Sequence, residues 1–179
     1  EELRKRIDEL KKNNKQQKLL DEIAKVAEKL NKEELSKKIK QLAEQNKQQE
    51  RSLERTLELV KRFYIEQKTM QIVNKLNDLG EKQELLEKKD VDNLEDQKEI
   101  KKGFEKIKKE LNELTKDNKE LKDPMELADV EEEKKDIDQE LNKAEEGLKS
   151  KDRGLSKKNQ KKSAVKMKEM SAKMQKAMS

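Results

Sequence analysis

The side chains that could do chemistry in this sequence are acids and lysines. The chain has 179 residues, of which 41 are Asp or Glu and 46 are Lys or Arg, with no His and no Cys. An imidazole base, a thiolate nucleophile, a disulfide and a metal site built on nitrogen or sulfur ligands are therefore excluded. What remains open is carboxylate catalysis, cation binding through oxygen ligands, and recognition by charge.

Carboxylate catalysis needs a pair of acids in a cleft with shifted pKa values. With 30% hydrophobic and 2% aromatic residues, the chain has too little apolar material for a thick core around such a cleft. Asp90, Asp92 and Asp96 alternate as in a calcium loop, but the glycine and the terminal Glu of an EF-hand are missing. We therefore predict no catalytic residue, no metal site and no cofactor.

Charge is distributed unevenly along the chain, which has a net charge of +5. Residues 149–179 carry eleven Lys or Arg against two acids, whereas residues 126–146 carry ten acids against three Lys. Oppositely charged segments of one chain can attract each other or can separate two kinds of partner.

The basic C-terminal segment is the one candidate interaction surface, because its lysines surround a stripe of methionines at helical spacing. The candidate residues are Lys157, Lys158, Lys161, Lys162, Lys166, Met167, Met170, Met174 and Met178. A basic amphipathic helix can lie on an anionic membrane, enter a partner's groove or meet nucleic acid. Alternatively, the methionines pack inside the protein, on the stripe formed by Leu3, Ile7 and Leu10.

The elements that must position these residues are helices. Charged residues make up 49% of the chain, and there are only four Gly and one Pro, which favours long amphipathic helices over disorder. A mostly apolar seam, interrupted by Asn46, Gln49 and Gln67, recurs at steps of four and three from Leu35 to Met70. A second apolar edge from Leu57 to Leu79 indicates more than one neighbour, or a partner that wraps around the helix. Near Asn31 a capping-box pattern leaves open whether this helix breaks or bends.

The pattern divides the chain into two arms. Residues 1–88 form an outgoing arm, residues 89–93 a turn, and residues 94–179 a returning arm with breaks at 122–124 and 147–155. The strongest local signal is Asp123 followed by Pro124, with Glu126 two positions later, which predicts a helix starting there. Asp92 and Glu95 form another capping-box pattern, which predicts a helix from near Asn93. Its apolar stripe is Leu94, Ile100 or Gln97, Phe104, Ile107, Leu111, Leu114 and Leu121. A last helix is expected from about Ser156.

These lengths predict an all-α fold, an elongated antiparallel coiled-coil hairpin in which residue i lies near residue 180 − i. The alternative is a bundle in which the outer helices fold back beside the inner ones. No apolar run approaches the ~20 residues of a membrane span. The sequence opens without Met in what reads as mid-helix, so we expect a piece of a longer protein.

Three stretches of the sequence resemble a family of large Bacteroidetes proteins that is classified as a domain of unknown function. They are the run from Gln49 to Lys68, the start at residues 123–127, and residues 166–174. The resemblance implies the coiled-coil region of a protein anchored in the inner membrane by helices absent here, on the periplasmic side. It brings no catalytic residues.

Together these features predict a non-catalytic structural or interaction module that acts as a scaffold or spacer in a bacterial cell envelope. Protein partners and self-association are expected, and nucleic acid is not. The alternative is a binding module whose basic, Met-rich C-terminal helix docks on an anionic membrane, a partner groove or nucleic acid.

Overall fold

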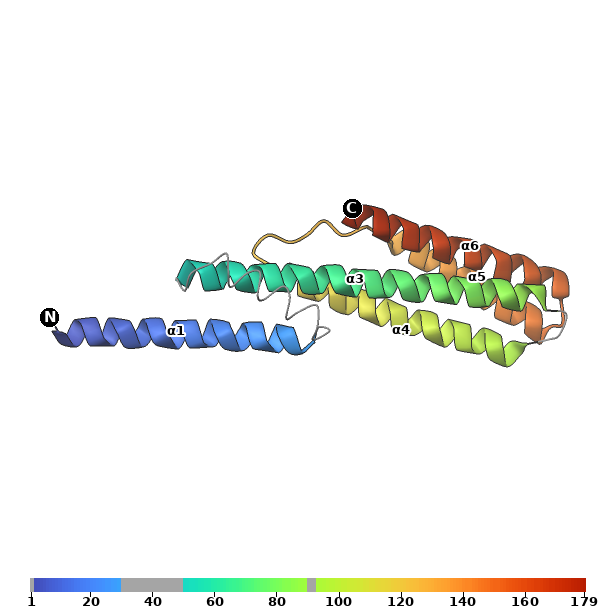
Figure 1. Ribbon diagram of the computed structural model, residues 1–179. Coiled ribbons are helices and arrows are strands. Elements are labelled where there is room, and N and C mark those ends of the chain that lie inside the picture. The colour runs from blue at the N-terminus through green and yellow to red at the C-terminus, as the bar shows by residue number, and fades with distance from the viewer. Residues whose placement is uncertain (1, 30–49, 90–92) are drawn as a thin grey trace. The chain divides into compact units, whose positions relative to one another are not determined.

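The computed structural model describes residues 2–29, 50–89 and 93–179, and all regular structure in these residues is helical (Figure 1). The helices are α1 (Glu2–Glu28), α3 (Glu50–Lys88), α4 (Leu94–Lys119), α5 (Glu131–Lys149) and α6 (Arg153–Met178). The prediction of an all-α protein is confirmed. By its internal contacts the chain divides into two units, residues 1–67 with 120–124 and residues 68–119 with 125–179.

The first unit contains a small apolar cluster between α1 and the first part of α3. Ile23, Leu57 and Val60 are buried, and further apolar side chains of both helices pack against them. The segment 120–124 is tied to α3 by polar contacts, since the Glu58 carboxylate accepts hydrogen bonds from the backbone N–H groups of Lys122 and Asp123. This cluster is short, so it supplies only modest hydrophobic stabilisation.

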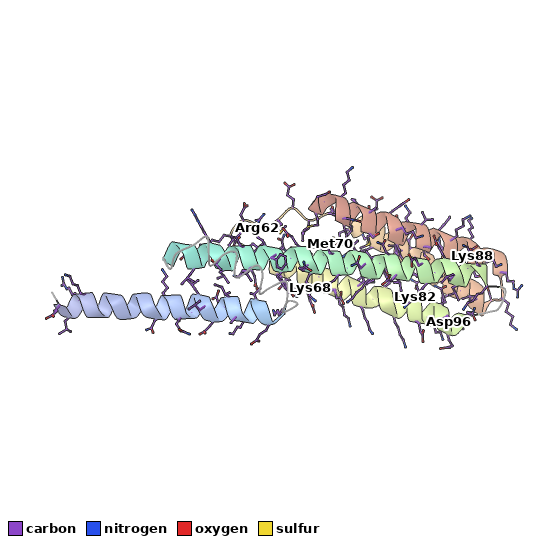
Figure 2. All side chains as sticks on the ribbon, in the orientation of Figure 1. Arg62, Lys68, Met70, Lys82, Lys88 and Asp96 are labelled. Atoms are coloured by element: carbon purple, nitrogen blue, oxygen red, sulfur yellow. The ribbon has the colours of Figure 1, made fainter. Side chains whose placement is uncertain are left out.

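The second unit is a four-helix bundle made of residues 68–88 of α3 together with α4, α5 and α6 (Figure 1). Lys88, near the end of α3, and Asp96, near the start of α4, lie at the same end of this bundle (Figure 2). An ion pair joins each pair of adjacent helices: Lys75–Glu110 for α3–α4, Lys108–Asp138 for α4–α5, Lys173–Glu133 for α5–α6 and Lys168–Glu84 for α6–α3.

The bundle core is built from the apolar stripes that the sequence shows. Its fully buried members include Leu76, Phe104, Ile137, Leu141 and Met167. The predicted stripe of α4 is confirmed, because Phe104, Ile107, Leu111 and Leu114 are all buried. Burial of such side chains, at roughly 25 cal/mol per Å² of apolar surface, is the main stabilising contribution.

The wide apolar stripe of α3 has the predicted cause, which is a second neighbour. Val73, Leu76 and Leu79 are buried on its second edge. Gly103 of α4 lies against Leu79, and Gly80 of α3 lies against Met167 of α6. In this part α3 therefore packs against α4 on one side and α6 on the other.

The single long hairpin is not confirmed, and within the second unit the chain takes the alternative, folded-back arrangement. Gln83 does bond to Gln97, as expected if residue i faces residue 180 − i. However, Ser163 of α6 also bonds to Gln83, so α6 returns beside α3. The possible break at Asn31 and the capping pattern at Asp92 lie outside the described residues.

The predicted helix start at Asp123 and Pro124 is wrong, because α5 begins only at Glu131. The Asn118 side chain holds the following segment by two hydrogen bonds to Met125, accepting from its N–H at 3.0 Å and donating to its C=O at 2.8 Å. A helix that began at Pro124 would need the Met125 C=O for its own ladder, so the hydrogen bond from Asn118 competes with the local helix signal.

Candidate functional site

The helix that carries the predicted interaction surface, α6, is positioned by a tight connection from α5. Lys151 adopts a left-handed backbone conformation with φ of 57°. Asp152 then caps α6 by accepting a hydrogen bond from the Leu155 N–H at 3.1 Å. The helix therefore starts at Arg153, three residues before the predicted Ser156.

A close approach at Gly147 fixes α5 against α6 near this connection. A Cβ atom at Gly147 would lie 2.6 Å from the backbone nitrogen of Ser156, which leaves no room for any side chain. The acidic α5 and the basic α6 are thus held side by side. Of the two possibilities for oppositely charged segments, attraction within the chain is the one the structure shows.

The methionines of the candidate surface are not on the surface. Met167, Met170 and Met174 are buried in the bundle core, and Met178 is partly buried. The prediction that Met167, Met170 and Met174 belong to an interaction surface is therefore wrong. The alternative prediction, that the methionines pack inside the protein, is correct for these three residues. Met167 packs against Gly80 of α3.

The proposed partners of the methionines were Leu3, Ile7 and Leu10. Leu3 is 75% exposed, and the side chains of Ile7 and Leu10 lie outside the described part of the chain. This pairing would join the first unit to the second, and it stays a prediction.

Next to the methionines, the inner face of α6 is polar. Ser156, Asn159, Gln160, Ser163 and Ser171 are all buried. Several of these side chains form hydrogen bonds to main-chain carbonyls of α6 itself. The Asn159 amide, for example, donates to the Leu155 carbonyl at 2.8 Å. The core of the bundle is therefore apolar along the methionines and polar toward the start of α6.

Four of the polar side chains in the core form a buried polar layer, which we define as Gln83, Gln97, Gln160 and Ser163. Gln83 and Gln97 exchange two hydrogen bonds, at 3.0 and 2.8 Å. The Gln160 amide donates to Gln97 Oε1 at 3.0 Å, and the Ser163 hydroxyl donates to Gln83 Oε1 at 3.1 Å. This layer links α3, α4 and α6 in one register.

The sequence analysis did not identify this layer. The available signal was at Gln97, which occupies the apolar stripe of α4 as an alternative to Ile100, and both residues are buried. Glutamines on a stripe of a Gln-rich chain are common, so this signal could not separate Gln83 and Gln160 from the exposed glutamines.

The lysines of the candidate surface lie on the outer face of α6. Lys158, Lys161 and Lys162 are exposed, whereas Lys157 and Lys166 are partly buried. Together with α5 they form an open groove of about 560 Å³. We define this α5–α6 groove by its lining residues, which are Lys158, Lys161, Lys162, Val165 and Lys166 of α6 with Asp136 and Glu140 of α5.

The groove is only partly neutralised from within. Lys166 lies 3.8 Å from Asp136 and 3.5 Å from Glu169. Lys158, Lys161 and Lys162 make no ion pair with any residue that the structure describes. Glu140 has one carboxylate oxygen, Oε2, that is buried without a hydrogen-bond donor. The groove therefore has unpaired cations on one wall and an incompletely bonded carboxylate on the other.

The carboxylates with shifted pKa values are placed for ion pairing. A hydrogen bond from Lys173 lowers the pKa of Glu133, against an opposing effect of burial, and Lys168 does the same for Glu84. Burial raises the pKa of Glu145, but hydrogen bonds from Lys149 and Lys101 outweigh it and the net shift is downward. A catalytic acid needs the opposite shift.

Two further hollows occur in the bundle. One of about 420 Å³ lies between α3 and α4 and includes Leu85, which is 62% exposed. Another, of about 260 Å³, lies at the end of the bundle near Thr69, Val130 and Met174. The first is lined by aliphatic and charged side chains alike, and the second mainly by aliphatic side chains.

Within residues 2–29, 50–89 and 93–179, no three acidic side chains come together as ligands of a metal ion do. None of the helices in the same ranges combines the length and apolarity that crossing a membrane requires.

Comparisons with models of protein families, with curated protein sequences and with solved structures find no match to this chain.

Proposed function

We propose that this chain is a non-catalytic interaction module, in which a rigid helical bundle presents charged faces to protein partners. One observation carries the proposal: the bundle buries most of its described large apolar side chains, while its outer faces keep charges that have no partner within the described chain, as at Lys158, Lys161 and Lys162. Close packing and a hydrogen-bonded layer keep such faces at fixed positions. Fixed charged faces suit a scaffold or spacer.

The proposed location is the periplasmic side of a bacterial inner membrane. This part of the proposal rests on the resemblance of three stretches of the sequence to a family of membrane-anchored Bacteroidetes proteins. In this setting the bundle would act as a scaffold among proteins of the cell envelope, held there by regions outside this sequence.

Photocrosslinking in the source cells tests the proposal. A photoreactive amino acid is placed singly at exposed positions on three helices, Lys82, Lys102 and Lys162. We expect reproducible covalent adducts with a small set of proteins from at least one face. The same amino acid at the buried Ile137 is the control for background labelling.

The outcomes separate the two parts of the proposal. If no exposed position gives adducts above the Ile137 control while the protein is present and helical, the interaction function is wrong. If adducts form with cytosolic proteins alone, the interaction function stands and the envelope location is wrong.

A further inference from the structure

We propose that the α5–α6 groove binds an acidic amphipathic helix of a protein partner. This inference deepens the proposed function and rests on it, since it names one face of the bundle and the chemistry of what that face recognises. Its starting point is the charge that the chain itself leaves unpaired in the groove.

The unpaired lysines of the groove are spaced so that they lie on one face of α6. Lys158, Lys161 and Lys162 stand at i, i+3 and i+4, so they share one face of α6. Each is exposed and has no ion pair within the described residues. Lys166, one turn further along, is already shared between Asp136 and Glu169. A binding partner would therefore find its main cationic contacts at the first three lysines.

The α5 wall of the groove carries an acid that has no partner within the described chain. Glu140 of α5 lines the same groove, and its Oε2 atom is buried without a donor. That oxygen is enclosed by the protein, but the Glu140 carboxylate makes no ion pair or hydrogen bond within the described residues, so its charge is not neutralised from within. The groove therefore offers sites for several anions on the α6 wall and for one cation on the α5 wall.

The position of the groove between two helices indicates a helical ligand. A groove between two packed helices accommodates a third helix, whose side chains enter the space between the two. Val165, at 46% exposure, supplies an apolar contact among the lysines. A partner helix with acids at i and i+4, one Lys or Arg on its other edge and a small apolar residue between them matches all three features.

Lipid and nucleic acid fit the groove less well. The methionines that could enter a membrane are buried in the core, and only Val165 is apolar in the groove. Asp136 and Glu140 would repel phosphates that lie between the two walls. No aromatic side chain lines the groove to stack on a base. A helix that carries both signs of charge avoids these costs.

The test measures binding of the full chain to a fluorescent helical peptide with this pattern, several Glu residues at i, i+4 spacing and one central Lys. The groove variant is Lys158→Gln with Lys161→Gln and Lys162→Gln. The matched control is Lys102→Gln with Lys106→Gln and Lys109→Gln, three exposed α4 lysines that also lack an ion pair within the described chain. Both triple variants change the net charge equally, and circular dichroism checks that each is folded.

We expect the groove variant to weaken peptide binding by at least about tenfold, because three charge-assisted contacts are lost, while the control changes it by less than about twofold. Wild-type affinity should fall as salt rises. Glu140→Gln should weaken binding of this peptide but not of a peptide whose central Lys is replaced by Gln. That dependence identifies the contact on the α5 wall.

The proposal is overturned if wild type does not bind the peptide, if both triple variants lose affinity equally, or if anionic vesicles or a single-stranded oligonucleotide bind more tightly than the peptide. A loss confined to the groove variant supports it. Failure here, with crosslinks still formed from Lys82 or Lys102, would remove the groove assignment and leave the proposed interaction function intact.

Discussion

Gln97 lies at the centre of the buried polar layer, where it exchanges hydrogen bonds with Gln83 and accepts another from Gln160. A buried amide is costly unless its donors and acceptors are satisfied, so each member of the layer depends on the others. A buried polar group of this kind can fix the register of packed helices, since any sliding would leave it without a partner.

Replacing Gln97 alone should therefore cost more than replacing the whole layer. We expect Gln97→Leu to reduce the free energy of unfolding by about 2–4 kcal/mol, because Gln83 and Gln160 lose their partner while remaining buried. Leu at positions 83, 97 and 160, with Ser163→Ala, should come within about 1 kcal/mol of wild type or exceed it. Urea unfolding followed by circular dichroism compares the two. A single variant as stable as wild type would contradict this account of the layer.

The glycines at 147 and 154 form a matched pair seven residues apart. We expect Gly147→Ala to destabilise the bundle by about 1–3 kcal/mol, since the new Cβ would lie 2.6 Å from the Ser156 backbone nitrogen and the two helices would have to separate. At Gly154 the nearest atom, Asp152 Oδ1, is 3.6 Å away. Gly154→Ala should leave the melting temperature unchanged or raise it. Equal effects of the two substitutions would rule out the close approach.

At the scale of elements, α5 and α6 pair as an acidic and a basic helix. Lys173 lies 2.9 Å from Glu133, and Lys166 lies near Asp136. Exposed ion pairs contribute little to stability, about 0–1 kcal/mol each. Their effect is therefore to orient α6 on α5, while Ala144, Ile137 and the methionines supply the burial that holds the pair together.

The Glu133–Lys173 pair should give stability a defined dependence on pH. Lys173 lowers the pKa of Glu133 below its ordinary 4.5, so this contribution is fully present above pH 4.5 and is lost as the pH falls through the lower, folded-state pKa. Glu133 in turn raises the pKa of Lys173 above 10.5, so at the alkaline end the contribution is lost only above pH 10.5. Glu133→Gln should be less stable than wild type at neutral pH and indistinguishable from it in strong acid.

Thermal unfolding of the variant and wild type across pH measures this difference. Glu113→Gln on α4 is the control, because Glu113 is exposed and makes no ion pair within the described residues. This variant measures the effect of removing a carboxylate that has no lysine partner. If the Glu133→Gln variant keeps a constant deficit down to strong acid, the pair is not the cause.

At the scale of the whole molecule, the two units differ in how much apolar surface they bury. The second unit encloses Phe104, Ile137 and Met167 without exposure. Among the described residues, fewer apolar side chains are buried in the first unit, namely Ile23, Leu57, Val60, Ile65 and Leu121. Local opening is easier where fewer apolar contacts must be broken. The two units are therefore expected to differ in local stability.

Hydrogen exchange of the full chain should resolve that difference. We expect the slowest amides in α4, α5 and α6 around Phe104, Ile137 and Met167, and exchange at least about tenfold faster in residues 2–18 of α1. An isolated helix of this length is only marginally stable in water. Mass spectrometry of peptic fragments provides the measurement, and equal protection of α1 would show that it is held by contacts beyond the described cluster.

Local patterns in the sequence predicted much of the helical architecture. The apolar spacing of α4 predicted the buried Phe104, Ile107, Leu111 and Leu114, because the period of a helix fixes which side chains share a face. The lysines of the C-terminal segment were identified as an outer surface for the same reason. The methionines were assigned to that surface wrongly, since spacing shows that they share a face but not what covers it.

What the sequence by itself determined is the set of helices and the face each one would bury, because both depend on contacts within a turn or two of the chain. The tertiary structure alone decided that α5 and α6 fold back onto α3 and α4, that Asn118 delays the start of α5 and that three glutamines and a serine meet in the core. These outcomes depend on side chains up to 80 residues apart. A repeating pattern of apolar residues is compatible with several pairings of the same helices, and only the packed whole selects one.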